Sequence, residues 1–117
     1  MKVFKFGGAS VKNAEAVKNI GDILNSYSGN DLVIIISAMG KMTNAFEWLI
    51  NSYCYAKDKV KPALNDIVDY HNTILWKLFP DKKHIIYIEI NELYFQLEEI
   101  LDKPYNEDYD KTYDSII

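Results

Sequence analysis

The first 37 residues show two kinds of apolar pattern. Lys2–Phe6 is a short apolar segment that ends at two glycines, which predicts a strand. A helical spacing of three and four residues follows, with Asn13 in a suitable N-cap position and Ser28-Gly29-Asn30 as the turn that ends the helix. The apolar positions of this helix are Ala16, Val17, Ile20, Ile23, Leu24 and Tyr27.

The next apolar segment, Asp31–Ser37, is continuous and rich in β-branched residues. Such a segment is typical of a strand that is covered on both faces in a parallel sheet. Strand, helix and strand together form a βαβ unit. We therefore expect an α/β fold in which a βαβ unit with parallel strands is followed by several helices.

Beyond Ser37 the apolar spacing becomes helical. Either Thr43 or Asn44 can cap a first helix there. A second helix is expected to start near Pro62, because a first helical turn tolerates proline, and to stop before Pro80.

The segment His84–Ile90 fits two structures. On its own it resembles a strand, but apolar residues continue at helical spacing as far as Leu101. We predict a helix, because the longer period is the stronger signal. Pro104–Asp108 is then a loop, and Asp110–Ile117 begins a further helix.

The composition excludes several classes of protein. The chain has 117 residues, the size of one ordinary domain, and its 13 basic against 17 acidic residues argue against a nucleic-acid-binding protein. Cys54 is the single cysteine, which excludes an intramolecular disulfide and a cysteine cluster for a metal ion. The longest apolar run, Leu32–Ile36, is far shorter than the ~20 residues of a membrane span. Since the N-terminus shows no secretory signal either, we expect a cytoplasmic protein without membrane partners.

The turn Lys5–Ser10 has the chemistry of an anion-binding loop. Gly7 and Gly8 allow the backbone to approach a ligand closely, and amides at the start of a helix attract negative charge. Lys5 adds a mobile positive charge and Ser10 adds a hydroxyl. The glycine spacing fits neither the Walker pattern nor the dinucleotide fingerprint, so a purely structural turn remains an alternative from the residues alone.

A second loop, Ser37–Asn44, follows the second predicted strand. Ligands of open α/β sheets bind at the carboxyl ends of strands, and the small residues Ser37, Ala38 and Gly40 leave room there. Thr43 and Asn44 can present hydroxyl, amide and backbone donors. A role limited to helix capping stays open for Thr43.

The two loops together resemble those of one enzyme family. The sequence Lys5-Phe6-Gly7-Gly8-Ala9-Ser10-Val11 is similar to the opening motif of aspartokinases. Ser37-Ala38-Met39-Gly40, followed by Thr43-Asn44, resembles their second-strand loop, and the helix between the motifs agrees too. The resemblance continues, less distinctively, to Ile117, and it implies the N-terminal part of an amino-acid-kinase fold.

This resemblance implies a reaction and a role for each motif residue. The reaction transfers the γ-phosphoryl group of ATP to the side-chain carboxylate of L-aspartate, with Mg²⁺ held through the phosphates and no metal ligand from the chain. It is the first step of lysine, threonine and methionine biosynthesis. Lys5 would be catalytic and would contact the transferring phosphates. The phosphates of ATP would be bound by Lys5, Phe6, Gly7, Gly8 and Ser10. Aspartate would be bound by Ser37, Ala38, Thr43 and Asn44.

The resemblance also implies that residues 1–117 are the N-terminal part of a single kinase domain, without its ATP-binding half and its regulatory ACT domains. We expect the complete protein to be a homo-oligomer and the 117-residue chain alone to be inactive. Two alternatives remain. One is another amino-acid kinase, acting on glutamate or uridylate, and the other is a truncated, non-catalytic binding or assembly module.

Overall fold

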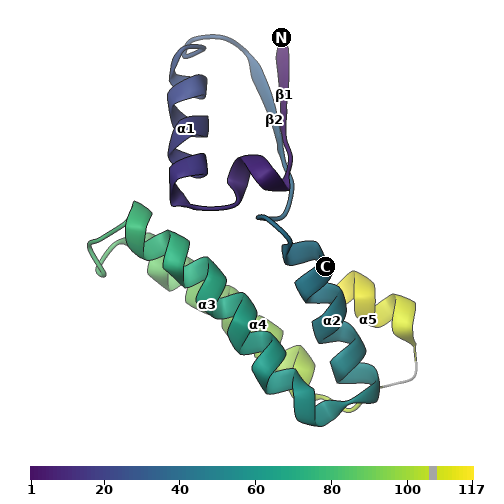
Figure 1. The fold of residues 1–117 in the computed structure, drawn as a ribbon. Coiled ribbons are helices and arrows are strands. Elements are labelled where there is room, and N and C mark those ends of the chain that lie inside the picture. Colours follow the sequence, from purple (N-terminus) through teal and green to yellow (C-terminus); the bar gives the residue numbers. More distant parts are fainter. Residues whose placement is uncertain (106–107) are drawn as a thin grey trace. The chain divides into compact units, whose positions relative to one another are not determined.

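The computed structural model describes residues 1–105 and 108–117, which form two compact units, Met1–Thr43 and Asn44–Ile117 (Figure 1). The first unit contains both strands, and the second is helical. The predicted α/β order of a βαβ unit followed by helices is therefore confirmed. The predicted loop Pro104–Asp108 falls partly on residues 106–107, which lie outside the described residues.

The first unit is a two-stranded parallel sheet with a connecting helix. Strand β1 (Lys2–Phe6) pairs with β2 (Leu32–Ile36), with Lys2 opposite Leu32 and Phe6 opposite Ile36. Helix α1 (Ala14–Asn25) joins them, preceded by a short 3₁₀ helix, η1 (Gly8–Val11), that the sequence pattern did not predict. The two strands and the start of α1 are where the pattern places them, but α1 ends at Asn25, so Tyr27, predicted as one of its apolar positions, lies in the turn that follows.

One face of the sheet packs against α1. Phe6, Val11 and Ile20 are the buried residues of this core. Side chains alternate across a strand, so Phe4 and Phe6 share the face that contacts the helix. The partly buried residues around the core are Phe4, Val17, Leu24 and Met39. The helix therefore uses the apolar stripe that its three- and four-residue spacing predicted.

Strand β2 is less covered than its sequence pattern predicts. Its four residues from Val33 to Ile36 are 39–58% exposed. A continuous apolar strand is expected to be covered on both faces, and in this unit one helix covers one face only. Each of the two strands also keeps one edge without a strand partner in the described part of the chain.

Replacing Asn13 by alanine is expected to destabilise the first unit by about 1 kcal/mol. The Asn13 side-chain oxygen accepts a hydrogen bond from the Ala16 amide at 2.8 Å, and alanine leaves that amide without its cap. Asn19→Ala, on the exposed surface of the same helix, is the matched control and should not destabilise the protein. Chemical denaturation of both variants measures the difference, and equal stabilities would contradict the capping role.

The second unit contains helices α2 (Met42–Tyr55), α3 (Val60–Leu78), α4 (Ile85–Asp102) and α5 (Tyr109–Ile116), with a short 3₁₀ helix, η2 (Lys57–Lys59), before α3. Its most completely buried side chains are Leu49, Ile50 and Ile67. Within the described residues, no helix is long and apolar enough to cross a membrane.

The start of α2 differs from the prediction. The Met42 amide donates to the Met39 carbonyl at 2.9 Å, and the helix begins at Met42. Gly40 takes a left-handed φ of 54°, which turns the chain early and leads directly into the helix. Thr43 and Asn44 therefore lie inside the first turn of α2, and neither is its N-cap.

Helices α3 and α4 lie side by side, joined by a short connection (Figure 1). The Tyr87 hydroxyl, on α4, donates to the carbonyl oxygens of Leu75 and Phe79 at the end of α3. The His84 imidazole accepts from the Ile86 amide at 3.1 Å and so caps α4. The ambiguous segment His84–Ile90 is thus helical, as the longer apolar period predicted.

The end of α4 is held by a side chain from the last turn of α2 and another from η2. The Tyr53 hydroxyl donates to the Lys103 carbonyl at 2.6 Å, and the Lys57 ammonium donates to the Leu101 carbonyl at 3.1 Å. The last carbonyls of a helix have no partner within it and carry partial negative charge, so a lysine there is favourable. These bonds join α2, η2 and α4 into one unit.

Candidate functional site

The two predicted loops meet at the carboxyl ends of the parallel strands. The Ser37 amide donates to the Phe6 carbonyl at 3.0 Å, which extends the sheet pairing by one residue. The Gly40 amide then donates to the Gly8 carbonyl at 2.9 Å. Two motifs about 30 residues apart in the sequence therefore form one backbone structure, at the sheet edge where α/β proteins bind ligands.

The contact between the loops requires glycine at position 8. A Cβ atom on Gly8 would lie 2.5 Å from the Gly40 carbonyl oxygen and 3.2 Å from that of Ala38. Both are backbone atoms, which cannot rotate out of the way as the end of a side chain can. A Cβ on Gly7, by contrast, would meet nothing within 4 Å. Gly8 allows the second loop to approach, while Gly7 leaves open space beside the first.

Lys5 and Phe6 point to opposite faces of β1. Phe6 is buried in the core against α1, so only its backbone faces the loops. Lys5 is exposed and stands opposite Ile35 in the strand pairing, on the face away from α1. Its ammonium is therefore free to approach a ligand at the end of the sheet.

Ser10 lies in η1, directly after the two glycines. Its amide donates to the Gly7 carbonyl at 3.0 Å, and its side chain is exposed. The first amides of any helix have no partner within it, and they carry partial positive charge. The short helix η1 thus places backbone amides that can attract an anion directly after the two glycines. The sequence analysis expected such amides at the start of a helix but did not predict η1.

The predicted acceptor-side residues are divided between the two units. Ser37 and Ala38 are exposed beside the loop contact, and the Ser37 hydroxyl lies 3.4 Å from the Ala38 carbonyl. Thr43 is exposed at the end of the first unit. Asn44 is the first residue of the second unit, which is described separately. The first unit therefore contains every predicted site residue except Asn44.

Gly40 has a second role beside leaving room in the loop, which is all that the sequence analysis expected of it. Its amide makes the bond between the loops, and its left-handed φ sets the course of the second loop. Met39 beside it packs against the core of the first unit and holds the loop on the sheet. The signal for this role in the sequence was a glycine separated by three residues from the end of an apolar strand.

The charge of the first unit suits an anionic ligand. Residues 1–43 contain five lysines and three acidic residues, whereas residues 44–117 contain eight lysines and fourteen acidic residues. Among the described residues, no three His, Cys, Asp or Glu side chains are placed to hold a metal ion. Backbone amides, a lysine and hydroxyls are thus the groups that this site offers.

Comparison with known proteins gives one family. The profile of the amino acid kinase family matches residues 1–93. The chain is 48% identical over 42 residues to aspartokinase 1, chloroplastic, of Arabidopsis thaliana, which covers 36% of this chain and 7% of that protein. It is 46% identical over 44 residues to an aspartokinase of Bacillus sp. (strain MGA3), which covers 36% of this chain and 11% of that protein.

A bifunctional relative is similar over a longer segment. The bifunctional aspartokinase/homoserine dehydrogenase 1, chloroplastic, of Zea mays is 30% identical over 71 residues, covering 61% of this chain and 8% of that protein. The matched segments are thus between 7% and 11% of the length of these three relatives.

Proposed function

Because this chain belongs to the amino acid kinase family, we propose that it supplies the phosphate-binding loops of an aspartokinase, which transfers the γ-phosphoryl group of ATP to L-aspartate. The observation that carries the proposal is the backbone contact between Gly8 and Gly40, which joins both loops at the ends of the strands. The aspartokinase relatives support aspartate as the phosphoryl acceptor.

The proposed roles follow from what each group can do. Phosphoryl transfer depends mainly on positioning and on compensating negative charge. The Lys5 ammonium would meet the charge that shifts during transfer. The amides of Gly7 and Gly8 and the Ser10 hydroxyl would hold the phosphate oxygens, and the open space beside Gly7 lets them approach. Mg²⁺, bound through the phosphates, would neutralise part of their charge.

The acceptor would lie on the side of the second loop. The exposed Ser37 and Thr43 hydroxyls can donate to a carboxylate, and Ala38 leaves space between them and the first loop. Asn44 adds an amide from the first turn of α2. The parallel pairing of β1 and β2 would keep the acceptor and the phosphates at one edge of the sheet.

The proposal is tested with the protein that carries the complete kinase domain. ADP release is measured with aspartate, glutamate and UMP as acceptors. We expect turnover with aspartate to exceed turnover with the other two. Preferred turnover of glutamate or UMP would assign the chain to a different amino-acid kinase, and no turnover with any acceptor would favour a non-catalytic binding module.

Replacing Thr43 by alanine is expected to raise KM for aspartate and to change kcat little. The hydroxyl would contact the acceptor in both the ground state and the transition state, and the loss of such a uniform contact appears in KM. One lost hydrogen bond to a charged group corresponds to about 1.5–3 kcal/mol, or roughly a 10- to 150-fold change. Steady-state kinetics with each substrate varied in turn measure it. A change confined to KM for ATP would show that Thr43 contacts ATP and was wrongly assigned to aspartate.

A further inference from the structure

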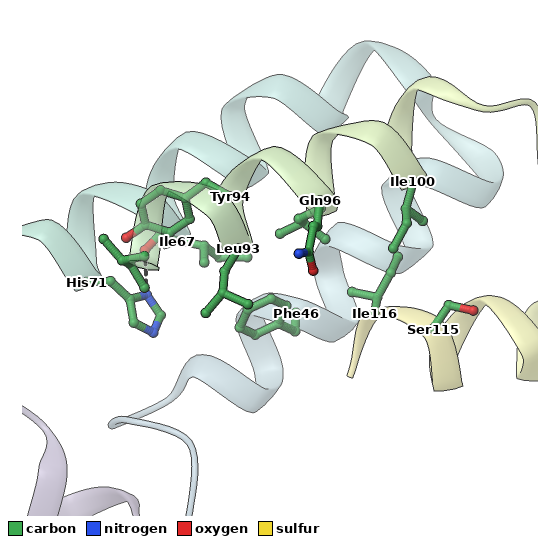
Figure 2. A pocket seen from close by; sticks show the side chains of 11 residues that line it. Phe46, Ile67, His71, Leu93, Tyr94, Gln96, Ile100, Ser115 and Ile116 are labelled. Carbon is green, nitrogen blue, oxygen red and sulfur yellow. Dashed lines mark hydrogen bonds between the residues drawn. The ribbon is translucent and has the colours of Figure 1, made fainter. Parts of the chain in front are cut away.

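A cavity of about 300 Å³ lies within the second unit, and none of its lining residues is assigned to phosphoryl transfer. All four long helices of this unit line it: α2 contributes Phe46, α3 contributes Ile67 and His71, α4 contributes Leu93, and α5 contributes Ile116 (Figure 2). Small-molecule sites in proteins start at about this volume. A cavity of about half this size, lined by similar residues, holds benzene.

The lining is mostly apolar. His71, Gln96 and Ser115 are polar lining residues, and Figure 2 shows the Ser115 hydroxyl turned away from the other lining side chains. Tyr94 lines it mainly with its ring, since its hydroxyl donates to the Asn72 side chain at 3.1 Å. Burial raises the pKa of Tyr94 to about 12, so this hydroxyl keeps its proton and its bond. The cavity thus suits an apolar body with a small polar end.

The bonds made by the three polar groups decide what that polar end must be. The His71 Nδ1 atom lies 2.7 Å from the Ile67 carbonyl, which can only accept, so Nδ1 donates to it, and in the tautomer that carries its proton on Nδ1 the Nε2 atom is an acceptor. The Ser115 hydroxyl donates to the Lys111 carbonyl at 2.9 Å and is directed away from the cavity. Of these two groups, His71 is therefore the one that can accept from a ligand.

Gln96 adds both an acceptor and a donor. Its amide nitrogen lies 3.4 Å from a Glu92 carboxylate oxygen, which leaves the Gln96 carbonyl oxygen and one further N–H for a ligand. The surroundings carry negative charge, since residues 44–117 contain fourteen acidic residues against eight lysines. This negative charge disfavours a carboxylate, and the acceptors on His71 and Gln96 favour a ligand group that donates hydrogen bonds.

From this arrangement we propose that the second unit binds a small molecule with one aromatic or alicyclic ring and a hydrogen-bond-donating amine or hydroxyl group. The ring lies among Phe46, Ile67 and Leu93, and the donor group points to His71. This site is independent of the proposed kinase reaction, because none of its residues belongs to the phosphate or acceptor loops.

The test uses three probes with the same ring and similar length: phenethylamine, 2-phenylethanol and 3-phenylpropionate. Each is titrated into the 117-residue chain while the NMR signals of the cavity-lining methyl groups are followed. We expect saturable shifts with the amine and the alcohol, and at least fivefold weaker binding of the carboxylate. Absence of saturable shifts, tightest binding of the carboxylate, or a chain without helical circular dichroism would each overturn the proposal.

Two substitutions on α4 locate the site. Leu93→Trp fills the cavity and should weaken binding of the amine more than tenfold. Ile88→Trp makes a comparable change on the same helix at a residue of similar exposure, 70% against 58% for Leu93, that does not line the cavity, so it should leave binding unchanged. Equal effects of the two variants would contradict the location.

His71→Phe tests the acceptor. It keeps an aromatic ring but removes Nε2, so binding of the amine and the alcohol should weaken about fivefold, the range of one net hydrogen bond. Binding of 3-phenylpropionate should not weaken. Equal weakening of all three probes would show that His71 acts only through packing, and would remove the donor requirement from the proposal.

Discussion

Replacing Lys5 by alanine in the complete kinase is expected to lower kcat by about two to three orders of magnitude, with a much smaller rise in KM for aspartate. The ammonium would meet charge that develops during transfer, and contacts made only in the transition state appear in kcat. Removing one preorganised donor at such a position costs about 2.7–4 kcal/mol. Steady-state kinetics at saturating ATP measure the effect.

Lys18→Ala is the matched control for this prediction. Lys18 is an exposed lysine on α1 of the same unit, so the variant loses the same charge without touching either loop. Its kcat should stay near that of the unchanged protein. Lys5 is also exposed, so its truncation should leave the melting temperature nearly unchanged. A Lys5→Ala variant with near-normal kcat would remove this residue from the mechanism.

Replacing Gly8 by alanine is expected to separate the two loops. The added methyl would lie 2.5 Å from the Gly40 carbonyl oxygen, so one of the two backbones must move. Inserting a methyl group into such a contact costs about 1–3 kcal/mol. Activity should fall together with stability, because in the proposed reaction the same contact would set the distance between the phosphates and the acceptor. Chemical denaturation and amide hydrogen exchange at Gly40 measure the change.

Gly7→Ala separates the effect of space from the effect of removing a glycine. Gly7 has an extended conformation that alanine adopts freely, with φ −76° and ψ 177°, and its Cβ would meet nothing within 4 Å. This variant should gain about 0.4–1 kcal/mol of stability, because alanine restricts the unfolded chain. If both variants showed the same stability, the close approach at Gly8 would not be what holds the loops together.

The sequence by itself determined the local structure. The apolar spacing predicted β1, α1 and β2. A spacing of three and four residues is typical of a helix, and short apolar segments bounded by turn residues are typical of strands. Asn13 was a recognisable cap, since its short side chain bonds the first free amides. The helix over His84–Ile90 followed from a period that extended well beyond the ambiguous segment. Both loop motifs, and with them the family, were also readable from residue types in order.

The tertiary structure decided how these pieces meet. No local pattern shows that Gly8, and not Gly7, lies against Gly40, because that contact depends on the parallel register of two strands far apart in the chain. The start of α2 at Met42 depended on the left-handed turn at Gly40, which overrode the capping preference of Thr43. Only the packing of four helices placed His71 at a cavity, since a cavity is formed by several helix faces together and no single helix pattern shows it.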